Sequence, residues 1–98
     1  MRMFVRVWEY DVHPERLEAF VTAYGADGDW AQLFQRSSGH IGTELLRSTG
    51  EPTRFVTVDR WTDQASWLAF LEEWGEAYAA LDASLTGLTV SERSLVEG

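Results

Sequence analysis

The side chains of this sequence that could do chemistry are few, because two reactive residue types are missing. The 98 residues include no Cys and no Lys, which excludes thiolate nucleophiles, thiolate metal sites, Schiff bases and phosphate-binding lysines. His40 and Asp59 remain as candidate bases. Tyr78 and Arg6 remain as candidate hydrogen-bond donors to a developing anion. We therefore expect acid–base chemistry, with His40, Asp59 and Tyr78 as the catalytic residues.

Aromatic side chains form a second group with a suggestive spacing. Two predicted helices carry them three or four positions apart, which places them on one face of each helix. Such faces could enclose a planar aromatic substrate. The alternative is an ordinary core, because every amphipathic helix needs an apolar face. The residues expected to bind a substrate are Arg6, Trp8, Trp30, Phe34, Trp67, Phe70 and Trp74.

Each polar candidate also has a purely structural interpretation. Asp59 could form an ion pair with Arg6 within a sheet face. His40, near the start of a predicted strand, could be a hydrogen-bonded structural histidine. Tyr78 could cover the core with its hydroxyl group in water. His13 fits the N-cap position of a helix better than a catalytic role.

The charge balance excludes several classes of partner. Sixteen acidic residues against eight basic ones give a net charge of −8. Binding to nucleic acid or to an anionic membrane surface requires clustered positive charge, so we expect neither. The sequence lacks an apolar run of the roughly 20 residues needed to span a bilayer, and it shows no signal peptide. We therefore expect a cytoplasmic protein, and the two histidines have no zinc-site spacing.

The sequence repeats one pattern in its two halves. Residues 4–7 match residues 55–58, and residues 19–25 match residues 69–75. In each half an alternating strand is followed by an amphipathic helix that reaches a glycine. The pattern predicts strands at 3–10, 40–47, 54–61 and 89–96, with helices at 14–25, 30–36 and 63–84, the last one kinked at Gly75.

These elements predict a single α+β domain over residues 1–98. The order β-α-α-β-β-α-β is that of the ferredoxin-like split βαβ fold, with helices on one face of a four-stranded antiparallel sheet. Both faces of the first strand carry large apolar residues, so one face would stay exposed in a monomer. We expect a homodimer in which the two sheets pack together as a dimeric α/β barrel. The aliphatic face with Val5 and Val7 suits the interface, and the mixed face with Arg6, Trp8 and Asp59 suits a pocket.

One segment resembles a known family. Residues 58–70, Val-Asp-Arg-Trp-Thr-Asp-Gln-Ala-Ser-Trp-Leu-Ala-Phe, are similar to the strand, Trp, cap and aromatic helix of the antibiotic biosynthesis monooxygenase family. Residues 12–16 and 39–46 resemble its strand-to-helix entry and its second strand. The resemblance implies a dimeric α/β barrel. The haem-degrading branch of that family uses an Asn and a helix His, and this sequence has no Asn and no His on its long helix.

The resemblance implies a function as well as a fold. The polyketide-oxidising branch oxygenates anthrone- or quinol-like aromatic molecules with O₂, without metal or flavin. We therefore expect a cofactor-independent monooxygenase acting on a small aromatic substrate, although some members of that branch also use an Asn. Two alternatives stay open at this point: a non-catalytic domain for small-molecule binding or assembly, and a cofactor-free cyclase or isomerase on the same fold.

Overall fold

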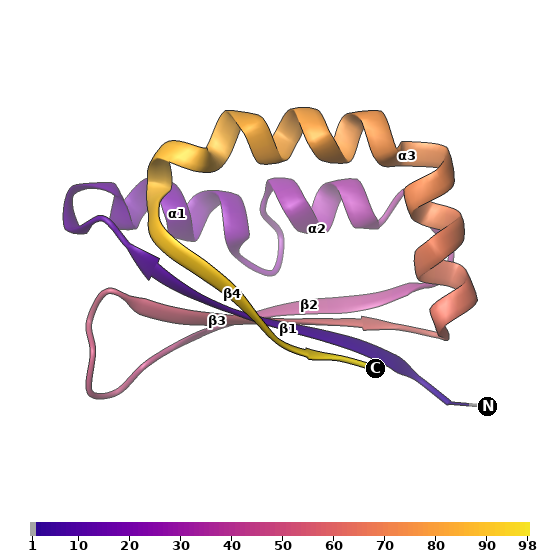
Figure 1. The fold of residues 1–98 in the computed structure, drawn as a ribbon, viewed down its shortest axis with the longest axis horizontal. Helices are drawn as coiled ribbons and strands as arrows, with labels where there is room; N and C mark the ends of the chain where they lie inside the picture. Colours follow the sequence, from indigo (N-terminus) through magenta and orange to yellow (C-terminus); the bar gives the residue numbers. More distant parts are fainter. Residues whose placement is uncertain (1) are drawn as a thin grey trace.

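The fold is a four-stranded antiparallel sheet, in the order β2-β3-β1-β4, with its helices on one face (Figure 1). The computed structural model describes residues 2–98. No helix in this range is long and apolar enough to cross a membrane. The elements are β1 (Phe4–Val12), α1 (Leu17–Tyr24), α2 (Asp29–Phe34), β2 (His40–Arg47), β3 (Arg54–Trp61), α3 (Gln64–Leu85) and β4 (Thr89–Glu97), with 3-10 turns at Pro14–Arg16 and Thr86–Leu88.

This architecture confirms the predicted α+β ferredoxin-like fold and its element order. The bounds of β2 and β3 agree with the prediction at every residue. The first helix differs, because Pro14 opens a 3-10 turn and regular α-helix begins only at Leu17. Such turns are common at helix N-termini. His13 occupies the N-cap position as expected, but its side chain makes no capping hydrogen bond.

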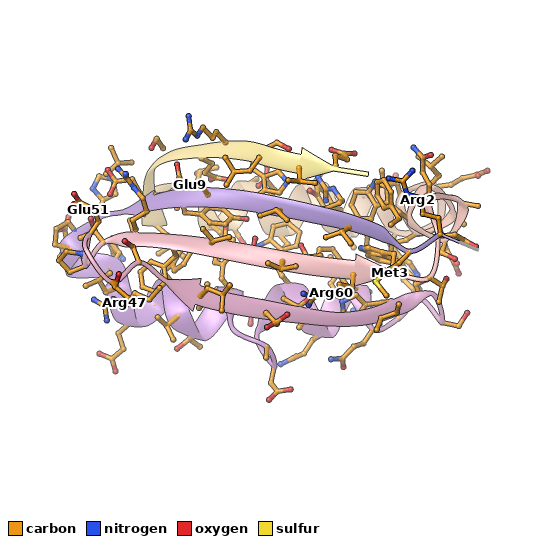
Figure 2. The ribbon with its side chains drawn as sticks, turned by 90° about the horizontal axis from the view of Figure 1, so that it is seen from below. Arg2, Met3, Glu9, Arg47, Glu51 and Arg60 are labelled. Atoms are coloured by element: carbon orange, nitrogen blue, oxygen red, sulfur yellow. The ribbon has the colours of Figure 1, made fainter. Side chains whose placement is uncertain are left out.

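The central strands β1 and β3 bury alternate residues under the helices, as a half-covered sheet requires. On β3 the buried side chains are Phe55, Thr57, Asp59 and Trp61. The mixed face therefore lies beneath the helices, as predicted. The opposite face carries Val5 and Val7 of β1 and Val56 and Val58 of β3, and no helix covers it (Figure 2).

The internal repeat corresponds to the two halves of the core. Phe20 of α1 and Phe70 of α3 occupy matching positions, and both are buried completely or almost so. The spacing of apolar residues predicts one buried stripe on each of these helices, formed by Leu17, Phe20, Val21 and Tyr24 on the first and by Trp67, Phe70, Leu71 and Trp74 on the long one. One stripe residue is exposed instead. Val21 is 44% exposed, because α1 packs on the sheet through Phe20, Ala23 and Tyr24 instead.

Helix α3 starts at a side-chain cap and later changes direction (Figure 1). Asp63 Oδ1 accepts a hydrogen bond from the Ser66 N–H at 2.8 Å, which satisfies one of the free amides of the first turn. The kink lies at Trp74, with φ −116° and ψ 15°, one residue before the predicted Gly75. The kink divides α3 into two segments, and Tyr78 and Asp82 of the second segment line the cavity described below.

Candidate functional site

A cavity of about 160 Å³ lies between the helix-facing side of the sheet and the helices, and it is partly open to solvent. Its lining combines aromatic side chains with hydroxyl, carboxylate and guanidinium groups. The lining residues are Arg6, Trp8, Tyr10, Tyr24, Trp30, Phe34, Thr43, Thr57, Asp59, Tyr78, Asp82 and Glu92.

Strand register places three polar residues in a row on the sheet side of this cavity. Thr43 of β2 is the direct partner of Asp59 of β3, and Asp59 is the direct partner of Arg6 of β1. All three are at least nine-tenths buried. Because directly opposed residues in a sheet lie on the same face, the carboxyl group has a hydroxyl on one side and a guanidinium on the other.

Burial sets the acidity of Asp59. Loss of water around the carboxylate raises its pKa from 3.8 to about 6, against the opposing effects of the Thr43 hydrogen bond and the Arg6 charge. Thr43 Oγ1 donates this hydrogen bond to Asp59 Oδ1 at 2.7 Å. A carboxylate with a pKa near 6 is mostly ionised at neutral pH and is a stronger base than an ordinary aspartate, so Asp59 suits proton abstraction.

His40 contacts Thr43 on the side away from the cavity. Its Nε2 lies 3.0 Å from Thr43 Oγ1. In a regular strand, residues three apart point to opposite faces. The register irregularity between His40 and Gly42 inserts one extra residue into β2, so both His40 and Thr43 turn to the helix side. The ring of His40 does not line the cavity, since it packs against Phe34 and Trp61.

The His40 ring is only partly buried. Burial lowers its pKa, which the Gly42 backbone opposes in part. The single Thr43 proton is used in the bond to Asp59, so the bond between His40 and Thr43 requires a proton on His40 Nε2. The ionised form of Asp59 therefore corresponds to the Nε2–H tautomer of His40.

Arg6 is held by an aromatic ring and a distant carboxylate. Its guanidinium carbon lies 4.0 Å from the centre of the Trp67 ring and 5.8 Å from that of Trp8. Its Nε lies 3.8 Å from Glu97 Oε2 and has no hydrogen-bond partner within residues 2–98. Within the same range Arg6 forms no close salt bridge with Asp59, so the ion pair that the sequence allowed is not formed, although the Arg6 charge still lowers the pKa of Asp59. Because Arg6 lines the cavity, the positive charge of its guanidinium group can stabilise an anion there.

The aromatic wall comes mainly from the helices. Trp30 of α2 packs against Tyr78 of α3 with ring centres 4.9 Å apart, and against Phe34 at 5.7 Å. Trp8 of β1 lies on the sheet side. The predicted site residues that line the cavity are Arg6, Trp8, Trp30, Phe34, Asp59 and Tyr78.

Three predicted wall residues lie elsewhere. Trp67 and Phe70 are buried in the core, where they pack on Trp61. The first segment of α3, which carries both residues, lies at one end of the sheet (Figure 1). Trp74 lies at the kink, and the Arg36 guanidinium covers its ring at 4.8 Å. None of the three lines the cavity. Trp67 still contributes to the site, as the surface on which Arg6 rests.

Sequence reasoning missed half of the lining. These residues are Tyr10, Tyr24, Thr43, Thr57, Asp82 and Glu92. The Tyr10 hydroxyl is hydrogen-bonded to Thr57 Oγ1 at 3.1 Å, and burial raises the pKa of this phenol. Burial also raises the pKa of Tyr24, to about 12. The alternation of faces along a strand could have found Thr57, because it lies two residues before Asp59 and therefore on the same face.

Within residues 2–98 no group of three or more His, Cys, Asp or Glu side chains is arranged to hold a metal ion. The candidate site described above is made of protonatable and aromatic side chains. The chemistry that such a set offers is proton abstraction by Asp59 and anion stabilisation by Arg6 and the Tyr78 hydroxyl, next to aromatic surfaces that can hold a flat ring.

Solved structures share this fold. SnoaB, a cofactor-independent oxygenase from Streptomyces nogalater, has a TM-score of 0.70 at 20% identity, over 98% of this chain and 93% of that one. The NE2512 protein from Nitrosomonas europaea has a TM-score of 0.71 at 22% identity, over 98% of this chain and 88% of that one. PA3566 from Pseudomonas aeruginosa has a TM-score of 0.70 at 12% identity, over 97% of this chain and 91% of that one.

At these identities the likeness shows the fold alone. A search of curated proteins found no match. The family comparison reaches further, because the model for antibiotic biosynthesis monooxygenase matches residues 3–81. That range includes β1, β2, β3 and most of α3, and therefore Arg6, Thr43, Asp59 and Tyr78. By this match the chain belongs to the antibiotic biosynthesis monooxygenase family.

Proposed function

We propose that this protein is a cofactor-independent monooxygenase that uses O₂ to oxidise a small, electron-rich aromatic molecule. The observation that carries the proposal is the buried Asp59 carboxyl, with its pKa raised to about 6, on the sheet side of an aromatic-walled cavity. Membership of the antibiotic biosynthesis monooxygenase family supports it. So does the likeness in fold to SnoaB, which is a cofactor-independent oxygenase.

In the proposed reaction the substrate itself supplies the electrons. Asp59 removes a proton from a phenol or an activated ring C–H, and Arg6 and Tyr78 stabilise the resulting anion. The anion transfers an electron to O₂, and the two radicals combine as a peroxide. Loss of water from the peroxide leaves a new carbonyl group. One oxygen atom enters the product and the other leaves as water with two substrate hydrogens, so no external reductant is needed.

The size of the cavity favours a quinol-like ring over a larger ring system. A closed apolar cavity of about 150 Å³ holds one benzene molecule. The volume here is about 160 Å³, so it encloses one ring. A fused anthrone would have to extend out of the cavity, past the exposed Asp82 and Glu92 on its lining.

Oxygen uptake with a panel of substituted quinols and anthrones tests the proposal. We expect consumption of O₂ with one ¹⁸O atom from ¹⁸O₂ in the product, and no return of O₂ when catalase is added. Asp59→Asn should lower kcat about 100-fold, as loss of a general base does. Glu73→Gln, an exposed change on α3 outside the cavity, should leave kcat unchanged.

Other outcomes would contradict the proposal. Product formation without O₂ would indicate a cyclase or isomerase that uses the same base. Tight binding of an aromatic ligand without any turnover, unaltered in Asp59→Asn, would indicate a binding domain.

We also propose that the protein is a homodimer joined through the uncovered sheet face. Val7 of β1 pairs with Val58 of β3 on one side and with Val96 of β4 on the other, which makes an apolar row across this face. Val96 is 49% exposed, and Leu46 of β2 is 50% exposed. Exposed apolar patches of this kind mark interaction surfaces. Analytical ultracentrifugation should show a dimer that Val58→Glu dissociates. A wild-type monomer at micromolar concentration would contradict this proposal.

A further inference from the structure

We propose that Thr43 and His40 form a proton relay between the buried Asp59 carboxyl group and solvent. This inference rests on the proposed function, in which Asp59 is the base. The relay makes Thr43 and His40 positioning residues that act through Asp59, since His40 does not line the cavity.

The need for a relay follows from the burial of the base. Asp59 is 6% exposed, and a substrate in the cavity would cover its open side. The chain of hydrogen bonds leaves Asp59 in another direction. It runs 2.7 Å from Asp59 Oδ1 to Thr43 Oγ1 and 3.0 Å on to His40 Nε2, and it ends at a partly exposed imidazole ring. Both distances are within the range for direct proton transfer along hydrogen bonds.

The relay has two states that differ by one proton. In the first state Asp59 is ionised, Thr43 donates to it, and His40 Nε2–H donates to Thr43. In the second state Asp59 holds a proton on Oδ1 and donates to Thr43, Thr43 donates to His40 Nε2, and His40 carries its proton on Nδ1. Conversion of the first state to the second takes up one proton from water at Nδ1. The reverse conversion releases one proton to water and leaves Asp59 ionised.

The proton exchange can be followed through the hydrogen-bonded chain from Asp59 to Thr43 and His40. The charged and titratable groups that act on Asp59 from β1 are Arg6 and the Tyr10 phenol, and burial keeps Tyr10 protonated. Across the cavity, α1 presents Tyr24, α3 presents Tyr78 and Asp82, and β4 presents Glu92. His40 is bordered by the uncharged rings of Phe34 on α2 and Trp61 on β3.

The relay also accounts for the irregularity in β2. Without the register shift between His40 and Gly42, His40 and Thr43 would face opposite sides of the sheet and could not touch. Bulges of this kind re-aim side chains next to active sites.

Nuclear magnetic resonance of the ¹⁵N-labelled protein tests the relay without any substrate. We expect the His40 ring-nitrogen shifts to show the Nε2–H tautomer at high pH, with an inflection that coincides with the ¹³C titration of the Asp59 carboxyl group. Thr43→Val keeps the size of the side chain and removes the hydroxyl group, so the two titrations should separate. Thr43→Ser should restore their coincidence. The ring signals of His13, which contacts Glu15 and lies outside this group, serve as an internal reference and should not change between the forms.

A second arm uses turnover of any quinol that the wild type oxidises. Thr43→Val should lower kcat about tenfold or more with little change in KM, and Thr43→Ser should recover most of it. If Thr43→Val does not fold, the Asp59 titration is compared between wild type and His40→Gln: a shifted midpoint is expected, and an unchanged midpoint overturns the relay. A His40 titration that is the same in wild type and Thr43→Val overturns the relay. Absence of oxygenation by the wild type overturns the proposed function, and the nuclear magnetic resonance arm still decides the relay.

Discussion

The guanidinium carbon of Arg6 lies 4.0 Å above the ring of Trp67, although the two residues are far apart in the sequence, on β1 and on the first segment of α3. A cation over an indole face is attracted to the negative face of the ring. Trp67 is therefore a second partner of this buried arginine, beside the Glu97 carboxylate at 3.8 Å from Arg6 Nε. Because Arg6 is not neutralised by a close ion pair with Asp59, its charge can act on Asp59 and on a bound anion alike.

Replacement of Arg6 by methionine should raise the pKa of Asp59 above about 6. The positive charge favours the carboxylate, so its removal favours the protonated acid. Arg6→Lys keeps the charge and should leave the pKa close to its present value. The ¹³C titration of the Asp59 carboxyl group measures both. Equal pKa values in Arg6→Met and wild type would show that Arg6 does not act on the acid.

The raised pKa of Asp59 predicts a pH-dependent cost in stability. Between about pH 4 and pH 6 the folded protein holds a proton on Asp59 that the unfolded chain has already lost, so stability falls as pH rises through this range. At pH 7 the cost is about 3 kcal/mol at most, from 1.36 kcal/mol per pKa unit. Asp59→Asn removes it and should be more stable than wild type at pH 7, while it loses activity.

Urea unfolding of both proteins at several pH values between about pH 4 and pH 8 measures this cost. The other titrating groups are shared, so they cancel in the difference between the two curves. The difference should grow from pH 4 to pH 6 and then stay level. Parallel curves would mean that Asp59 titrates alike in the folded and unfolded states.

The alternation of residue types made much of the fold predictable. Arg6 and Asp59 alternate with valines on their strands, so the sequence already assigned both to one face, and that face lies under the helices. The kink of α3 was misplaced by one residue, at Gly75 in place of Trp74. Glycine lowers the cost of a helix kink. The position of the kink, however, depends on how the two segments of α3 pack against the sheet and against α2. Packing of this kind does not show in a single sequence.

The site was harder to predict than the fold. Thr43 and Thr57 are ordinary strand residues in the sequence, and only the register of β2 and β1 with β3 gives each its polar partner. The contact between His40 and Thr43 depends on a register shift that cannot be predicted from the residue types of β2. Trp67 and Phe70 share the spacing of wall residues, but they lie in the core. Helical spacing predicts which residues share a face, and it does not distinguish a core from a pocket.

The unequal members of the helix stripes predict unequal effects of truncation. Phe70 is 1% exposed and contacts the rings of Trp61 and Trp67, so Phe70→Ala should cost about 3–5 kcal/mol of unfolding free energy. Val21 follows the same sequence pattern but is 44% exposed, so Val21→Ala should cost only about 0.5 kcal/mol or less. Chemical denaturation of the two variants checks this. Similar losses would contradict the assignment of Val21 to the surface.

Tyr78 allows its two proposed roles to be separated, because its hydroxyl group and its ring do different things. The ring packs on Trp30 at 4.9 Å and completes the aromatic wall, and the hydroxyl group is the proposed donor to the substrate anion. Tyr78→Phe keeps the ring, so it should lower kcat about tenfold or more and leave KM and the unfolding free energy nearly unchanged. Tyr78→Ala also removes the wall and should raise KM. Steady-state oxygen uptake separates the two parameters. Unchanged kcat in Tyr78→Phe would assign Tyr78 to the wall alone, and stabilisation of the anion would then rest on Arg6.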